Sequence, residues 1–204
     1  MHISAQLLGI PLVEIPEKYD EVEAHMLKSY FSYLKLNEDI LLVHWNMRDS
    51  TYGFFAIELR GELLCTESIY RLPNYRKVDL ARLFIKLYGY KYAKHPQFQS
   101  LIERNYKLPR RFLSGKEEIE AFEQGEYVKM HQSTSVKVNN MSKLLEMAIN
   151  GELKTDASWK DTYGLSIAGL LALIKSKWYL QLCWWLFVVV VANILGAFVV
   201  GMVL

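Results

Sequence analysis

The last 25 residues of the chain, Leu180 to Leu204, contain no Lys, Arg, Asp, Glu or His. A helix of that length measures about 37 Å, at about 1.5 Å per residue, and a bilayer hydrocarbon core is about 30 Å thick. Fifteen of the 25 residues are Leu, Ile, Val or Phe, which favours insertion by roughly 4 to 9 kcal/mol. The run therefore predicts a C-terminal transmembrane helix over residues 178–204.

The residues before this run indicate an orientation. Positive charge precedes the run and none follows it, so the positive-inside rule places the N-terminal side in the cytoplasm. Aromatic residues gather at the same end, as they do at a membrane interface. The predicted interface residues are Lys175, Lys177, Trp178, Tyr179, Trp184 and Trp185. The expectation is a tail-anchored, single-pass protein of an inner (cytoplasmic) membrane, with its C-terminus at or across the far face.

The residues before the anchor predict an α+β cytosolic domain over residues 1–130. Apolar residues recur at helical spacing over 17–36, 78–95, 96–108 and 114–122. Between the first two of these helices, β-rich runs occupy 39–47, 52–60 and 62–71, separated by short polar turns. The predicted fold is a helix, a three-stranded antiparallel meander and further helices, followed by the transmembrane helix.

Residues 131–177 are expected to connect this domain to the anchor. The segment 131–140, HQSTSVKVNN, is polar and predicts a linker, and Gly151 closes a short helix after it. Ser158 and Asp161 have the spacing of a capping box. The apolar residues that follow, as far as Ile174, are too few to span a bilayer. They predict a juxtamembrane amphipathic helix that is interfacial or re-entrant, and the alternative is one continuous helix from 158 to 204.

Basic residues concentrate between Arg71 and Arg111, where only Asp79 and Glu103 oppose them, although the whole chain is nearly balanced at 24 basic and 22 acidic residues. The eleven are Arg71, Arg76, Lys77, Arg82, Lys86, Lys91, Lys94, Arg104, Lys107, Arg110 and Arg111. Such a stretch can bind anionic lipid headgroups or an acidic protein surface. Interleaved tyrosines leave single-stranded RNA as a weaker alternative, and an ordinary solvated helix face is equally compatible with the pattern.

Small residues within the C-terminal run predict helix–helix packing. The residues are Ala192, Asn193, Gly196, Ala197 and Gly201. Small residues four apart let two helices approach closely, and an asparagine beside them can hydrogen-bond across the contact. The sequence therefore predicts association of this helix with another subunit or with a second copy.

No residue pattern names a reaction. The five histidines have no metal-ligand spacing with another His, Cys or carboxylate, and there is no glycine-rich phosphate loop. The two cysteines give no disulfide framework. We therefore predict neither a metal nor a cofactor, and no catalytic residues.

The sequence favours a non-enzymatic scaffold or assembly subunit of a membrane complex, such as a secretion- or conjugation-like machine. The expected partners are membrane lipids and either other subunits or the protein itself, with nucleic acid unlikely. One alternative is a self-assembling membrane effector, defence or exclusion protein with a cytosolic sensing domain. Another is a membrane-tethered enzyme.

Overall fold

A computed structural model describes the backbone of residues 1–48, 53–65, 68–164 and 167–203, and their side chains except at 167–170, 172 and 194–203. The described chain is mostly helical and has one two-stranded sheet. In chain order the elements are α1 (His2–Leu7), η1 (Leu12–Glu14), α2 (Tyr19–Leu36), β1 (Leu42–His44), α3 (Phe54–Leu64), η2 (Asn74–Arg76), β2 (Lys77–Asp79), α4 (Leu80–Tyr88), α5 (Gln97–Asn105), α6 (Gly115–Glu123), α7 (Tyr127–Ile149), α8 (Trp159–Tyr163), α9 (Ile167–Ser176) and α10 (Trp178–Val203).

The predicted three-stranded antiparallel meander is wrong. Only residues 42–44 of the first β-rich run form a strand, and that strand pairs in parallel with β2, in the register Leu42 to Lys77 and His44 to Asp79. Most of the second run lies in helix α3. The described part of the third run, after the end of α3, contains no strand. Strand propensity reflects how side chains pack more than a fixed backbone preference, and here tertiary contacts favour a helix.

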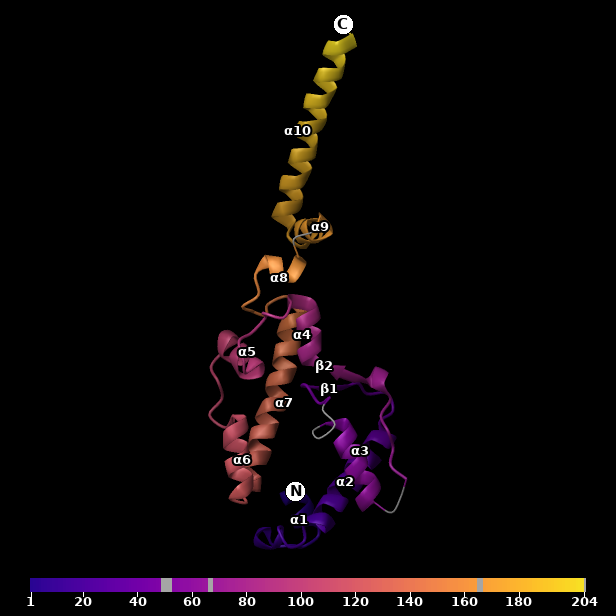
Figure 1. The fold of residues 1–204 in the computed structure, drawn as a ribbon, viewed down its shortest axis with the longest axis vertical. Helices are drawn as coiled ribbons and strands as arrows, with labels where there is room; N and C mark the ends of the chain where they lie inside the picture. Colours follow the sequence, from indigo (N-terminus) through magenta and orange to yellow (C-terminus); the bar gives the residue numbers. More distant parts are fainter. Residues whose placement is uncertain (49–52, 66–67, 165–166, 204) are drawn as a thin grey trace.

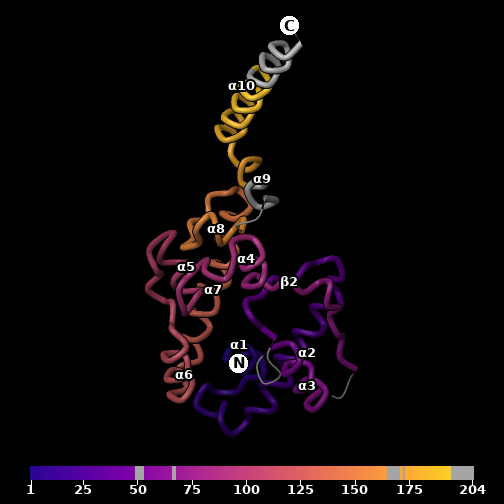
Figure 2. The backbone as a smooth tube through the Cα atoms, turned by 45° about the horizontal axis from the view of Figure 1, so that its top comes forward, coloured from indigo at the N-terminus to yellow at the C-terminus, as the bar shows by residue number. Residues whose placement is uncertain are grey.

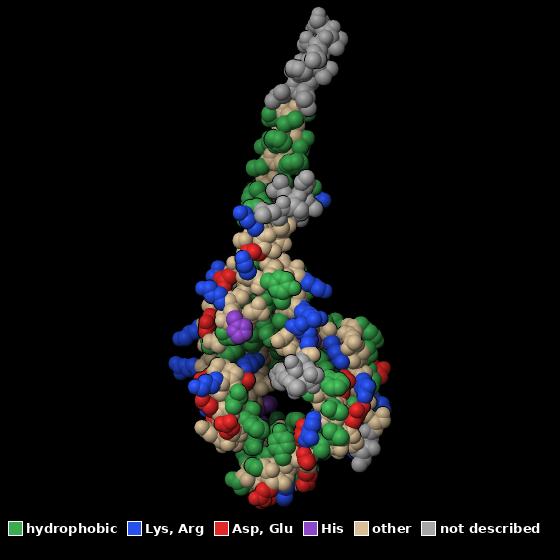
Figure 3. Space-filling view, viewed as in Figure 1, with side chains coloured by type: hydrophobic (Ala, Val, Ile, Leu, Met, Phe, Trp, Pro, Cys, Tyr) green, Lys and Arg blue, Asp and Glu red, His purple; other side chains and the backbone are tan. Residues whose placement is uncertain are grey.

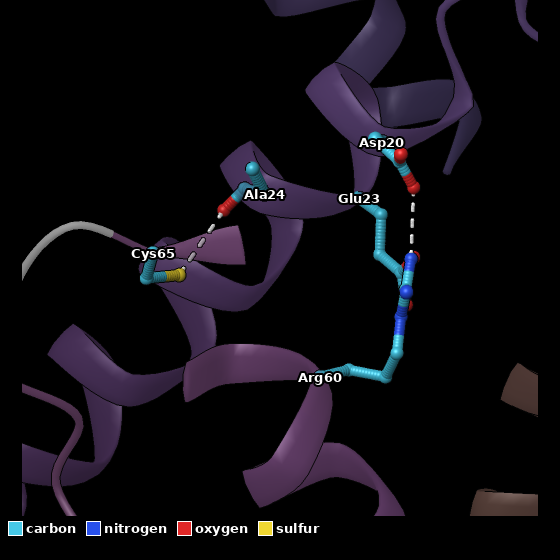
Figure 4. A network of polar contacts seen from close by, with 5 residues as sticks. All are labelled: Asp20, Glu23, Ala24, Arg60 and Cys65. Atoms are coloured by element: carbon cyan, nitrogen blue, oxygen red, sulfur yellow. Dashed lines mark hydrogen bonds and ion pairs between the residues drawn. The ribbon is translucent and has the colours of Figure 1, made fainter. Parts of the chain in front are cut away.

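The contact between α2 and α3 explains why residues 54–64 are helical. Gly61 lies against the ring of Phe31, and a Cβ atom built on Gly61 would stand 2.3 Å from Phe31 Cε2. Arg60 reaches from α3 to two carboxylates on α2, those of Asp20 and Glu23 (Figure 4). The helical period places both contacts on the side of α3 that faces α2, which the alternating period of a strand would not do.

The helices of the body form two groups that the small sheet connects (Figures 1 and 2). One group contains α4 to α7, and its core includes Leu80, Phe84, Tyr92, Leu101 and Leu144. The other contains α1 to α3, with two smaller apolar clusters. In one of these clusters Tyr127, the first residue of α7, packs with residues of the N-terminal segment, so the two groups also meet away from the sheet.

The predicted polar linker at 131–140 is part of α7, an uninterrupted helix of 23 residues. Two of its polar side chains, Ser133 and Asn140, make hydrogen bonds within the fold, although the buried Asn140 Oδ1 has no partner among the described residues. Ser133 accepts a hydrogen bond from the Leu113 amide and donates one to Glu118, and the Asn140 side chain donates to the Val136 carbonyl. The polar composition that favours a loop is therefore compatible with a helix, because these side chains find partners on α6 and along α7 itself.

The predicted capping box at Ser158 and Asp161 is present and begins α8. This helix ends at Tyr163 with Gly164 as its C-cap, and α9 begins at Ile167, so residues 158–174 do not form one helix; residues 165 and 166 lie outside the described part of the chain. Helix α10 then projects away from the body and carries the C-terminus at its far end (Figure 1).

In the part of the chain that the structure describes, no helix has both the length and the apolar character needed to cross a bilayer. This finding corrects the predicted transmembrane helix at 178–204. It also corrects the expected tail-anchored, single-pass placement in an inner membrane.

Candidate functional site

The described part of α10 exposes apolar side chains in every direction around its axis. Four consecutive residues, 184 to 187, are 45, 61, 49 and 58% exposed, and all four are Trp, Leu or Phe. Consecutive helical residues point about 100° apart, so four of them cover the whole circumference. On the face drawn in Figure 3, apolar side chains gather along the described part of this helix. This exposed helix is the first candidate functional surface.

Two of the five predicted packing residues, Ala192 and Asn193, have described side chains, and both are exposed. The Asn193 side-chain nitrogen donates to the Val189 carbonyl at 2.7 Å, which leaves its oxygen as an acceptor. Gly196, Ala197 and Gly201 belong to the end of α10, where side chains lie outside the described part of the chain.

The residues predicted to lie at a membrane interface gather where α9 meets α10. Lys175 and Lys177 are exposed there, and the Lys175 carbonyl accepts a hydrogen bond from Gln181 at 2.6 Å. Trp178 and Tyr179 make an edge contact with each other, and Trp184 and Trp185 follow about two turns later. Their assignment as interface residues depended on the transmembrane helix that the structure corrects.

The members of the predicted eleven-residue basic stretch lie on η2, β2, α4, α5 and the loops between them. Four of the eleven have partners within the chain. Arg71 pairs with Glu62, Lys77 with Glu58, and Arg104 with Asp156, and the buried Arg76 donates to main-chain carbonyls. The seven exposed members whose side chains make no hydrogen bond or ion pair with the described residues are Arg82, Lys86, Lys91, Lys94, Lys107, Arg110 and Arg111.

A second candidate site lies at the carboxyl ends of the two parallel strands. Here a pocket of about 400 Å³ is bounded by β1, β2 and the first turns of α3 and α4. We call it the strand-end pocket and define it by His44, Arg48, Phe54, Glu58, Lys77, Asp79 and Arg82. The register of the sheet places His44 directly opposite Asp79, so two side chains 35 positions apart meet at one edge.

The two carboxylate oxygens of Asp79 differ: Oδ1 accepts hydrogen bonds, whereas the buried Oδ2 accepts none from the described residues and makes only an ion pair. One carboxylate oxygen accepts from the amides of Asn46, Ala81 and Arg82, which caps α4, and the other lies 2.6 Å from Arg48 Nε. The neighbouring Glu58 carboxylate is 3.2 Å from Lys77 Nζ, and that ammonium also lies 4.7 Å from the centre of the Phe54 ring. Both acids in the pocket are therefore already paired with a cation.

His44 is only 6% exposed, and burial lowers its pKa. Its Nδ1 accepts a hydrogen bond from the Met47 amide at 3.3 Å, so a neutral imidazole carries its proton on Nε2. The ring also packs edge-on against Phe54. His44 lines a second, larger cavity of about 790 Å³ as well, which lies between the two groups of helices near Trp45 and Met141.

The sequence identified neither His44 nor Glu58 as a site residue. The predicted strands at 39–47 and 52–60 make His44 a core or sheet-face residue and place Glu58 within a strand. The local sequence indicates this pocket only through the polar residues His44 and Asp79, each of which ends a short apolar strand. The described residues bring no three His, Cys, Asp or Glu side chains together as metal ligands.

Searches against protein families, characterised proteins and solved structures found no match for this chain. The function must therefore be argued from the geometry of the two candidate sites.

Proposed function

We propose that the protein is a non-enzymatic assembly subunit that associates with copies of itself through α10. The observation that carries this proposal is the described part of α10, whose apolar side chains are exposed around the whole circumference. Fully burying a side chain of the size of Leu or Phe is worth about 1.5–3 kcal/mol. A helix that is apolar on all sides is normally buried among neighbours, and the body of this chain does not cover it.

Copies of the same chain fit this surface for two reasons. First, one partner helix covers only one side, whereas in a bundle of identical helices each member packs against at least two neighbours and buries more of its circumference. Second, no charged side chain occurs from Leu180 to Leu204, so identical helices can lie parallel without like charges opposing one another. Parallel packing also keeps all the bodies at one end, because α10 projects from the body in a single direction (Figure 1).

Asn193 supports a parallel arrangement. Its side-chain oxygen has no hydrogen bond to the described residues, while its nitrogen bonds only within the helix. In a parallel bundle the Asn193 side chains of neighbouring copies lie at the same height, where each amide can donate to the next. Paired asparagines at one level of a helix bundle fix the alignment of the helices at some cost in stability.

The test is the mass of the full chain in a mild detergent, measured by light scattering after size exclusion. We expect a discrete oligomer. Leu186→Glu places a charge on the proposed contact and should weaken association at least about tenfold, since a charge without a partner is costly to bury. Ile149→Glu is the matched control, because Ile149 is an exposed apolar residue at the end of α7 and lies outside the contact.

A monomer at every concentration would reject the proposal, as would equal effects of the two substitutions. Sedimentation with lipid vesicles in the absence of self-association would also reject it, because a lipid surface rather than another copy would then cover α10. Asn193→Leu should give oligomers of less uniform mass, since it removes the group that aligns the helices.

A further inference from the structure

The fold brings together two histidines that lie far apart in the sequence. His2 begins α1 and His131 lies in the second turn of α7, and the centres of their rings are 5.0 Å apart. Neither side chain makes a hydrogen bond or an ion pair with the described residues. His2 is half-buried and His131 is exposed, so solvent reaches the pair. Two such imidazoles on different helices are a candidate pair of metal ligands.

The separation of the two rings fits a shared metal ion. Histidine nitrogens bind metals at about 2.0 Å, and tetrahedral bonds meet at about 109°, so the centres of two ligating imidazoles lie about 5 Å apart. Burial first, and then the neighbouring charge of His131, lower the pKa of His2, which favours the neutral imidazole that a metal requires. Because ordinary ring contacts also occur at this separation, the other donors around the pair decide whether it can hold a metal.

The pair opens onto a pocket of about 560 Å³ between α1, α2, α6 and α7, which we call the histidine pocket. The side chains of Met26 and Met130 line it, and none of its described lining residues is Asp, Glu, Lys, Arg or Cys. Met26 Sδ lies 3.4 Å from the amino nitrogen of Met1, the residue before His2, and Met130 directly precedes His131. Two thioethers therefore belong to the surroundings of the two imidazoles.

These donors decide which metal fits. No three His, Cys, Asp or Glu side chains of the described residues could hold a metal together, so His25, which also lines the pocket, does not complete the site. The remaining ligands must then be thioethers. Thioether sulfur is a soft ligand that selects Cu(I), whereas Mg²⁺ and Ca²⁺ require the oxygen ligands that this pocket lacks. A set of uncharged donors also suits a monovalent ion better than a divalent one.

From this donor set we propose that the histidine pocket binds one Cu(I) ion through His2, His131, Met26 and Met130. The ion connects α1, α2 and α7, and so joins the two groups of helices. Methionine has three rotatable bonds, which lets both sulfurs turn toward the ion without movement of the backbone. The site does not involve α10, so it can fail or succeed without affecting the proposed assembly.

The test is transfer of Cu(I) from its bicinchoninate complex to the full chain, in mild detergent and without oxygen. Cys65 and Cys183 are free thiols that can bind Cu(I) themselves, so both are replaced by serine in every sample. We expect one Cu(I) per chain, measured as the loss of absorbance of the bicinchoninate complex. Absence of transfer would overturn the proposal. Equally tight binding of Zn(II) would also overturn it, because thioether ligands would then play no part in selecting the metal.

Side-chain variants test the ligands. His131→Gln should weaken Cu(I) binding at least about tenfold, since even outer-shell partners of metal ligands are worth that much. His95→Gln is the matched control, because His95 is exposed and does not line the pocket. Met26→Leu combined with Met130→Leu should weaken binding at least about tenfold while largely keeping the packing, since leucine and methionine are similar in volume. Unchanged binding by His131→Gln or by the double methionine variant would overturn the proposed ligand set.

The pH dependence separates imidazole from thioether ligands. Imidazoles must lose their protons to bind a metal, whereas thioethers carry none, so Cu(I) binding should weaken between pH 7 and pH 5. An affinity that stays constant over this range would exclude the two histidines as ligands.

Discussion

At the scale of single residues, Arg76 is the clearest case of a side chain whose role the sequence concealed. It belongs to the basic stretch that was expected to face an anionic surface, but it is only 4% exposed. Its guanidinium donates to the Asn37 and Ile40 carbonyls at 2.7 and 2.9 Å and to the Tyr70 hydroxyl at 3.1 Å. Arg76 therefore ties the end of α2 and the approach to β1 to the segment before β2.

We predict that Arg76→Ala destabilises the protein by about 2–4 kcal/mol, because two main-chain carbonyls lose their charged donor in a buried place. The control is Arg111→Ala, which removes an exposed arginine and should change the free energy of unfolding by less than about 0.5 kcal/mol. Urea unfolding followed by circular dichroism measures both. Equal midpoints for the two variants would show that the Arg76 hydrogen bonds contribute little.

At the scale of elements, the fold depends on how closely α2 and α3 approach. Gly61 permits the approach, because any side chain there meets Phe31. We predict that Gly61→Ala destabilises the protein by about 1–3 kcal/mol despite the better helix propensity of alanine. Gly115→Ala is the matched control, because a Cβ atom on Gly115 would have nothing within 4 Å. This substitution should raise the free energy of unfolding by up to about 1 kcal/mol. The two midpoints should therefore shift in opposite directions, and a shared direction would contradict this packing argument.

The first turn of α6 gives a prediction about pH. Hydrogen bonds from the Ser114 amide and then from its hydroxyl lower the pKa of Glu117. A carboxylate with a lowered pKa in the folded state stabilises that state at neutral pH, and the contribution disappears as the pH falls through the lowered pKa. Wild type should therefore be more stable than Glu117→Gln at pH 7, and the difference should shrink on acidification. A difference that stays constant from pH 7 to pH 3 would exclude this role for the charge of Glu117.

At the scale of the whole molecule, the body is expected to fold without α10. All three apolar clusters of the body consist of residues between Met1 and Ala157, and none includes a residue of α10. We predict that a chain ending at Lys177 keeps a cooperative thermal transition within about 3 °C of the full chain, since about 1 kcal/mol shifts the midpoint by roughly 2–4 °C in a body of this size. The same truncated chain should be monomeric if α10 mediates assembly. Loss of the cooperative transition would show that α10 belongs to the folding unit.

The sequence alone determined the features that depend on neighbours three or four positions away. The capping box at Ser158 and Asp161, the helix over 19–36 and the helix after Asp79 follow from side chains that bond or pack within one or two turns. The uncharged C-terminal run also forms a helix as expected, although the inference that it spans a membrane is not supported.

Only the tertiary structure decided the features that depend on distant neighbours. The composition of residues 54–60 predicted a strand, but Arg60 and Gly61 meet partners on α2 that lie 30 to 40 positions earlier. His44 and Asp79 share a pocket because two short strands pair in parallel across an intervening helix. No local period encodes which strand pairs with which. The pairing follows from the free energy of burying whole helices together, and this depends on all of their contacting side chains at once.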